Sequence, residues 1–157
     1  MEREQAIKYM RDLLTLIVEK KGSDMFITKD FPPAMKLDGK VTPVSKTKLS
    51  GDNTKALAYA IMNDRQIKEY EATKECNFAI APAGIGRFRC NAYIQQGACG
   101  LVLRVIETEV PNLDKLGLPE VLKEIISAKR GLVIMVGGTG SGKSTSLAAM
   151  IDHRNAN

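Results

Sequence analysis

The chain has 157 residues, of which 44% are hydrophobic and 26% charged, with a formal net charge of +5. These values are ordinary for a soluble globular protein, and the length suits one domain plus part of another. No run of eighteen apolar residues is present, so we expect no direct membrane insertion. The charged start, Met1 to Gln5, does not resemble a signal peptide. Cys76, Cys90 and Cys99 lack C-x-x-C spacing, which argues for a reducing compartment and against a metal site or disulfide framework.

The whole charge excess lies in residues 1–106. Eight lysines fall in one stretch with few acids: Lys20, Lys21, Lys29, Lys36, Lys40, Lys46, Lys48 and Lys55. A solvated lysine-rich face is the simplest explanation, and a surface for an acidic protein partner is the alternative. A nucleic-acid partner is disfavoured, because only 5% of residues are aromatic and no recognised nucleic-acid-binding motif is present.

In chain order, apolar residues at helical spacing predict a helix over residues 4–21, with Gly22 at its C′ position. Short strands follow at 25–28, 34–37 and 40–42, the last two joined by a hairpin at Asp38-Gly39. Two helices are then predicted, from a Ser50 cap to about residue 62 and from an Asp64 cap to about residue 73.

Three further strands are predicted at residues 77–81, 87–96 and 100–107. The middle one alternates cleanly, with Phe88, Cys90, Ala92 and Ile94 on one face and Arg87, Arg89, Asn91 and Tyr93 on the other. The element order indicates an α+β domain, an antiparallel sheet with helices on one face. A polar connection at 107–118, with Pro111 and Gly117, marks the expected domain boundary.

Beyond the boundary, a short helix is predicted from Pro119 to about Ser127, and then a buried apolar strand at 131–136. A helix follows from Ser144, with Leu147, Met150 and Ile151 on one face. Between strand and helix, residues 137–144 match G-x-x-x-x-G-K-[ST], the P-loop. An accidental glycine-rich turn is the weak alternative, since the flanking elements agree with the motif.

The P-loop predicts a site for ATP with Mg²⁺. Its glycines let backbone N–H groups form an anion nest, Lys143 supplies a positive charge for the β- and γ-phosphates, and Ser144 is placed to bind the metal ion. The expected nucleotide-binding residues are Gly137, Gly138, Thr139, Gly140, Ser141, Gly142, Lys143, Ser144 and Thr145.

Most of the remaining ATPase machinery is missing after residue 144. No apolar strand ending in Asp or Glu follows to hold the metal's water shell or orient the attacking water. One strand and one helix cannot bury a core. We therefore expect the chain to be the N-terminal part of a longer protein and not to hydrolyse ATP alone.

With these pieces placed, the chain resembles the secretion ATPase superfamily, specifically the type IV pilus twitching-motility ATPases of the PilT/PilU type. The segments that carry the resemblance are residues 22–28, 32–39, 86–93, 116–119 and 130–133 leading into the P-loop. Met25-Phe26 and Gly138 depart from the retraction ATPase pattern and, with residues 75–80, are more similar to PilU.

The resemblance implies a PAS-like domain over 1–106, a linker over 107–118 and the truncated start of a RecA-like α/β P-loop domain over 119–157. It also implies a homo-hexamer, or a mixed ring with a paralogous retraction ATPase. This ring would contact an inner-membrane platform protein at the cytoplasmic face of the inner membrane and power pilus retraction. In such a ring Arg87, Arg89 and Arg104 would approach the γ-phosphate and join Lys143 in catalysis. The alternative for the arginines is a solvent face with cross-strand partners.

Two functions remain open on the sequence. One is a part of the motor ATPase itself, and the other is an accessory, mainly structural or coupling subunit that binds ATP but depends on its paralogue. A P-loop kinase or nucleic-acid translocase needs a different domain before the P-loop and has little support.

Overall fold

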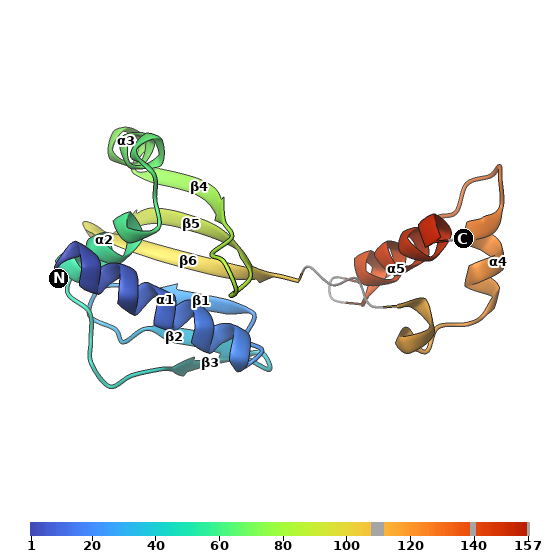
Figure 1. Ribbon diagram of the computed structural model, residues 1–157, viewed down its shortest axis with the longest axis horizontal. Helices are drawn as coiled ribbons and strands as arrows, with labels where there is room; N and C mark the ends of the chain where they lie inside the picture. The colour runs from blue at the N-terminus through green and yellow to red at the C-terminus, as the bar shows by residue number, and fades with distance from the viewer. Residues whose placement is uncertain (108–111, 139–140, 157) are drawn as a thin grey trace. The chain divides into compact units, whose positions relative to one another are not determined.

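The computed structural model describes residues 1–107, 112–138 and 141–156 (Figure 1). By its contacts the chain divides into two compact units, Met1–Glu107 and Thr108–Asn157, and each is described by itself. Thr139 and Gly140 of the P-loop, and residues 108–111 of the expected linker, lie outside the described residues. No helix in the described part of the chain is both long and apolar enough to cross a membrane.

The first unit is built on one six-stranded antiparallel sheet in the order β3-β2-β1-β6-β5-β4. The strands are β1 (Asp24–Ile27), β2 (Ala34–Leu37), β3 (Lys40–Pro43), β4 (Glu75–Ile80), β5 (Arg87–Gln95) and β6 (Ala98–Ile106). Each half of the sheet is a three-stranded meander, and the two halves meet where β1 pairs with β6. All six predicted strands of this unit are confirmed within a few residues at each end.

Helices α1 (Arg3–Glu19) and α2 (Gly51–Ala60) lie against one face of this sheet, and α3 (Asp64–Thr73) lies beside β4 (Figure 1). The covered face holds the core, which includes Met10 and Ile17 of α1, Leu57 of α2, and Phe88 and Leu103 of the sheet. The opposite face carries the polar residues of the alternating strands. The predicted α+β fold, an antiparallel sheet with helices on one face, is therefore confirmed.

The end of α1 differs from the prediction by one position. The left-handed C′ residue is Lys21, with φ +55°, and not Gly22. The N–H of Lys21 donates to Val18 O and that of Gly22 to Ile17 O, at 3.0 and 2.8 Å, which is a Schellman ending. Gly22 is needed for a different reason, because a Cβ there would lie 2.7 Å from Cγ1 of Ile17.

One helix cap is also corrected. Ser50 caps α2 as predicted, since its Oγ accepts from the Asn53 N–H at 3.2 Å. The cap of α3 is Asn63 and not Asp64, which lies inside the helix. Asn63 Oδ1 accepts from the Gln66 N–H, and Gln66 Oε1 accepts from the Asn63 N–H, both at 2.9 Å. This reciprocal capping box satisfies the backbone N–H groups of Asn63 and Gln66. Asp64 could not make the same pair of bonds, because it is already the first residue of the helix.

The second unit contains a short 3₁₀ helix η1 (Leu113–Leu116) and the helices α4 (Val121–Ser127) and α5 (Lys143–Ala156). Its small core consists of Leu113, Ala149 and Met150, with partly buried neighbours such as Leu122 and Met135. Met150 was expected on the apolar face of this last helix, and it is buried. Leu147 and Ile151, expected beside it, are 46% and 48% exposed, because no other described element covers them.

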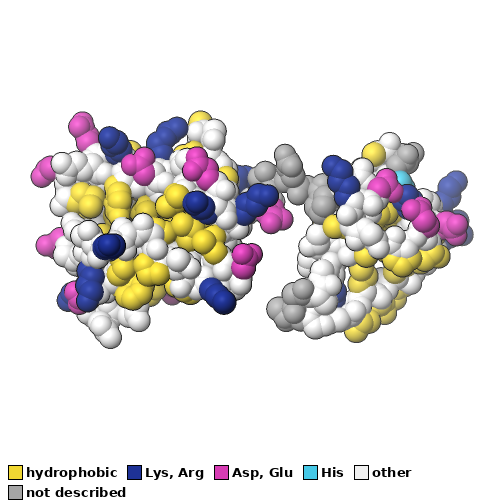
Figure 2. All heavy atoms as spheres, turned by 90° about the horizontal axis from the view of Figure 1, so that it is seen from below, with side chains coloured by type: hydrophobic (Ala, Val, Ile, Leu, Met, Phe, Trp, Pro, Cys, Tyr) yellow, Lys and Arg dark blue, Asp and Glu magenta, His cyan; other side chains and the backbone are white. Residues whose placement is uncertain are grey.

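The predicted buried strand at 131–136 is wrong for this structure. Residues 131–138 form no strand, and four of their side chains are exposed: Leu132, Val133, Ile134 and Val136. Figure 2 shows apolar side chains at the surface of this unit. A strand needs a hydrogen-bonded neighbour, and the described part of the unit contains no strand to pair with.

Candidate nucleotide site and arginine face

The P-loop leads directly into α5, whose first residue is Lys143. Gly142 has φ +86°, the left-handed region in which glycine is favoured. A Cβ on Gly137 would lie 2.6 Å from the Ser141 Oγ, so a larger residue there would require the Ser141 hydroxyl to turn away. A Cβ on Gly138 would meet nothing within 4 Å, so space does not force glycine at that position.

The Lys143 side chain folds back over the loop. Its Nζ donates to Gly137 O at 2.7 Å and to Gly138 O at 2.5 Å, and it lies 3.5 Å from the Ser141 Oγ. The ammonium group is therefore in direct contact with the loop that would hold phosphates. Ser144 and Thr145 are exposed on the first turn of α5.

These residues fit a nucleotide phosphate. The loop, its lysine and the start of a fourteen-residue helix lie together, which is the arrangement that favours an anion at a helix N-terminus. The Ser144 hydroxyl is an oxygen ligand of the kind that Mg²⁺ accepts. Within the described ranges, no group of three or more His, Cys, Asp or Glu side chains could hold a metal ion. Among the loop residues, Ser144 is the one that could bind the metal ion beside the phosphates.

The three arginines lie on the uncovered face of the sheet in the first unit. Arg89 of β5 is directly opposite Arg104 of β6, and Arg104 is opposite Asp24 of β1. Lys36 of β2 continues this row on the other side of Asp24. Arg87 lies two residues before Arg89 on the same face. The sheet register thus places Arg104 and Lys36 on either side of one carboxylate, with Arg89 one strand further along the row.

Arg104 has a definite partner. Its Nε donates to the Asp24 Oδ1 at 2.9 Å, and the Ser23 hydroxyl donates to the other carboxylate oxygen at 2.8 Å. Burial alone would raise the pKa of Asp24. The hydrogen bonds from Arg104 and Ser23, with the positive charges of Arg104 and Lys36, outweigh burial and hold that pKa below its ordinary value. Arg104 therefore has a partner on the neighbouring strand, which is the alternative that the sequence left open for these arginines.

Arg87 and Arg89 differ from Arg104, because neither side chain makes a hydrogen bond or ion pair with any described residue. Arg89 and Arg104 line a hollow of about 240 Å³ together with Asp24, Asn77, Asn91 and Val102. Asn91 Nδ2 donates to Asn77 Oδ1 at 2.8 Å, which fixes the wall of this hollow. Sequence reasoning placed Asn91 on the face of Arg87 and Arg89 but gave it no role. It missed Asp24 and Asn77, since only the sheet register brings these two beside the arginines.

A family model described as Type II/IV secretion system protein matches residues 1–157. The chain belongs to this family. The Type IV pilus ATPase PilU of Pseudomonas aeruginosa is 55% identical to this chain over 145 residues, which is 92% of this chain and 38% of that protein. The Type IV pilus retractation ATPase PilT of the same organism is 40% identical over 144 residues, 92% of this chain and 42% of that protein.

The fold also matches a solved structure of a pilus motor. The crystal structure of the pilus retraction motor PilT with bound ADP aligns with a TM-score of 0.80 and 35% identity. The alignment covers 92% of this chain and 42% of that one. The chain thus spans about two fifths of the length of the relatives it matches. The resemblance predicted from the sequence, with its emphasis on PilU, is confirmed.

Proposed function

We propose that this chain supplies the N-terminal domain and the phosphate-binding loop of an ATPase that powers type IV pilus retraction and twitching motility. The observation that carries the proposal is a P-loop with its lysine against the loop, in a chain 55% identical to a pilus ATPase. The domain assignment is part of the proposal: a PAS-like domain over 1–106, a linker over 107–118 and the start of a RecA-like domain over 119–157.

Each site residue has a proposed role in the whole protein. Lys143 binds the β- and γ-phosphates of ATP, Ser144 binds Mg²⁺, and residues 137–142 with Thr145 surround the phosphates. Arg87 and Arg89, which have no partner among the described residues, stabilise the charge that develops on the transferred phosphoryl group. Arg104 contributes to the same positive surface while it is held by Asp24.

The proposed assembly is a hexamer, either of one chain or mixed with a paralogous retraction ATPase. It works at the cytoplasmic face of the inner membrane against a platform protein of the pilus. The positive surface of one subunit would approach a nucleotide bound by another, because arginines supplied from a neighbour can complete a phosphoryl-transfer site.

The nucleotide role is tested by ATP titration and a turnover assay on this chain and on the whole protein. We expect turnover by the whole protein and its loss in Lys143→Ala. This chain alone should bind ATP weakly and turn over none, since residues 131–136 lack a supporting sheet. Micromolar ATP affinity of the chain alone would contradict this part of the reasoning.

The arginine role is tested separately by single-turnover hydrolysis in the whole protein. Arg87→Ala and Arg89→Ala should slow the chemical step and leave ATP affinity nearly unchanged, because these side chains act on the transition state. Lys40→Ala is the matched control, since it removes one exposed cation at the hairpin that joins β2 to β3. Hydrolysis at the unaltered rate in both arginine variants would overturn the assignment.

A second candidate is an accessory subunit that binds ATP but depends on its paralogue for retraction. It is favoured by the higher identity to PilU than to PilT, 55% against 40%. Retraction measured in cells that lack the paralogue separates the two. Retraction that persists supports an autonomous motor, and its loss supports the accessory subunit.

A further inference from the structure

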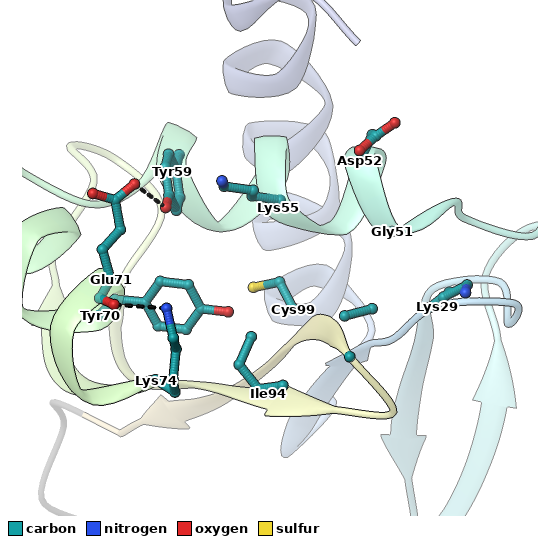
Figure 3. A pocket seen from close by; sticks show the side chains of 12 residues that line it. Lys29, Gly51, Asp52, Lys55, Tyr59, Tyr70, Glu71, Lys74, Ile94 and Cys99 are labelled. Carbon is teal, nitrogen blue, oxygen red and sulfur yellow. Dashed lines mark hydrogen bonds between the residues drawn. The ribbon is translucent and has the colours of Figure 1, made fainter.

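A hollow of about 450 Å³ lies in the first unit, away from the arginine face. It is bounded by the first turns of α2, the end of α3 and the hairpin between β5 and β6 (Figure 3). Its volume falls in the range of small-molecule pockets. Neither the nucleotide loop nor the arginine row contributes a side chain to it.

Three lysines give this hollow its charge. Lys55 lies with its Nζ 5.1 Å from the centre of the Tyr59 ring, Lys74 donates to the Glu71 backbone oxygen at 2.7 Å, and Lys29 lines the far side. Lys74 uses one of its three N–H donors in this way, so two remain for a ligand. The nearest ion pair of Lys29, with Asp30, is long at 4.0 Å and exposed.

In the described part of the chain, neither acidic side chain of the lining lies within 4.0 Å of these lysines as an ion pair. The Glu71 carboxylate lies at one edge, where it accepts a hydrogen bond from the Tyr59 hydroxyl at 2.9 Å. The Asp52 side chain points away from the other lining side chains in Figure 3. Burial, followed by the bond to Glu71, raises the pKa of Tyr59 to about 12, so this phenol adds no negative charge.

The floor of the hollow is apolar and partly uncovered. Ile94 belongs to the same face of β5 as Phe88 and Ala92, which are fully buried, yet it is 41% exposed. Ala98 and the buried Cys99 lie beside it on β6. Burial raises the pKa of Cys99, so its thiol is neutral. An occupant that covers Ile94 would bury apolar surface next to three ammonium groups.

We propose that this hollow binds a small organic phosphate. Its flat apolar body would pack on Ile94 and Ala98, and its phosphate would lie between Lys55 and Lys74. Apolar walls supply most of the contact area in such sites, and a few charged groups fix the orientation of the ligand. Two lysines in one lining favour a doubly charged group over a single carboxylate.

The test uses 1-naphthyl phosphate as the probe, followed in amide proton–nitrogen spectra of the whole chain. Inorganic phosphate and 1-naphthol are the companion probes, since each carries half of the proposed chemistry. We expect 1-naphthyl phosphate to shift the amides around Lys55, Lys74 and residues 97–99. The two companions should cause smaller shifts there at the same concentration.

Two variants and a control complete the experiment. Lys55→Ala should weaken binding about five-fold, the upper range for loss of one exposed charge contact. Lys74→Asn removes the second ammonium and suits the left-handed backbone at this position, where φ is +65°. Lys40→Ala, an exposed lysine on the distant β3, should bind as the unaltered chain does.

Three results would overturn the proposal. The first is a set of shifts confined to residues 137–145, which would place the phosphate on the nucleotide loop. The second is equal response to all three probes. The third is unchanged affinity in both lysine variants, whose own spectra report whether they are folded.

Discussion

Replacing Arg104 by alanine tests the charge arrangement on the open face of the sheet. The Asp24 side chain is only 8% exposed, and Arg104 donates to it at 2.9 Å. A hydrogen bond to a charged group is worth roughly 1.5–3 kcal/mol. Arg104 itself is 72% exposed, so water screens the pair. We therefore expect Arg104→Ala to lower the free energy of unfolding by about 1–2 kcal/mol near neutral pH.

The pH dependence gives the same prediction a second readout. The folded-state pKa of Asp24 lies below its ordinary value of 3.8, so the stabilisation is present above that value. It is lost as the pH falls through the folded-state pKa. The difference between the two proteins should therefore shrink as the pH falls below 3.8. In the Arg104→Ala variant the hydrogen bond and charge of Arg104 no longer oppose the effect of burial, so the pKa of Asp24 rises.

The measurement is urea unfolding followed by far-ultraviolet circular dichroism, because the chain has no tryptophan. Arg89→Ala is the matched control, since Arg89 is the cross-strand neighbour of Arg104 but has no partner among the described residues. Its effect should stay within about 0.5 kcal/mol. Equal effects of the two substitutions, or a loss for Arg104→Ala that does not change with pH, would refute the reasoning.

Three further predictions concern the fold of the first unit. Asn63→Ala should lower the free energy of unfolding in urea by about 1 kcal/mol, because the capping box is lost. An equally large loss in Asp64→Ala would instead support Asp64 as the helix cap. Phe88→Ala should cost about 3–5 kcal/mol, since the side chain is fully buried, and a thermal melt within a few degrees of the parent would contradict this. Burial raises the pKa of Cys90 to about 12, so iodoacetamide at mildly alkaline pH should label it, as detected by mass spectrometry, only after urea unfolds the protein. Labelling of the native chain at the rate of the unfolded one would count against that burial.

The strands of the first unit were predictable because alternation along β5 directly reflects one buried and one open face. The pairing of Asp24 with Arg104 was not, since it depends on a register between segments 80 positions apart. The same limit hid the lysine-lined hollow, whose walls come from four separate stretches of chain. Local patterns fix what a segment prefers, and only the assembled sheet decides which side chains meet.

The P-loop shows the opposite situation. Its glycines and lysine could be read from eight residues, and their geometry at Gly137, Gly142 and Lys143 agrees with the motif. The apolar run before it predicted a buried strand, yet Leu132 is 85% exposed. The apolar pattern shows that residues 131–136 are suited to a buried strand. They can form one only where neighbouring strands are present to pair with them.

The sheet order β3-β2-β1-β6-β5-β4 has a consequence for how the protein is made. Its two halves join only through β1 and β6, the first and last strands of the unit. During synthesis β1 therefore has only β2 as a neighbour until β6 leaves the ribosome and pairs with its other edge. Such distant pairing slows folding, because a long loop must close first. A pause in translation after β6 has left the ribosome would give this sheet time to close before the nucleotide loop emerges.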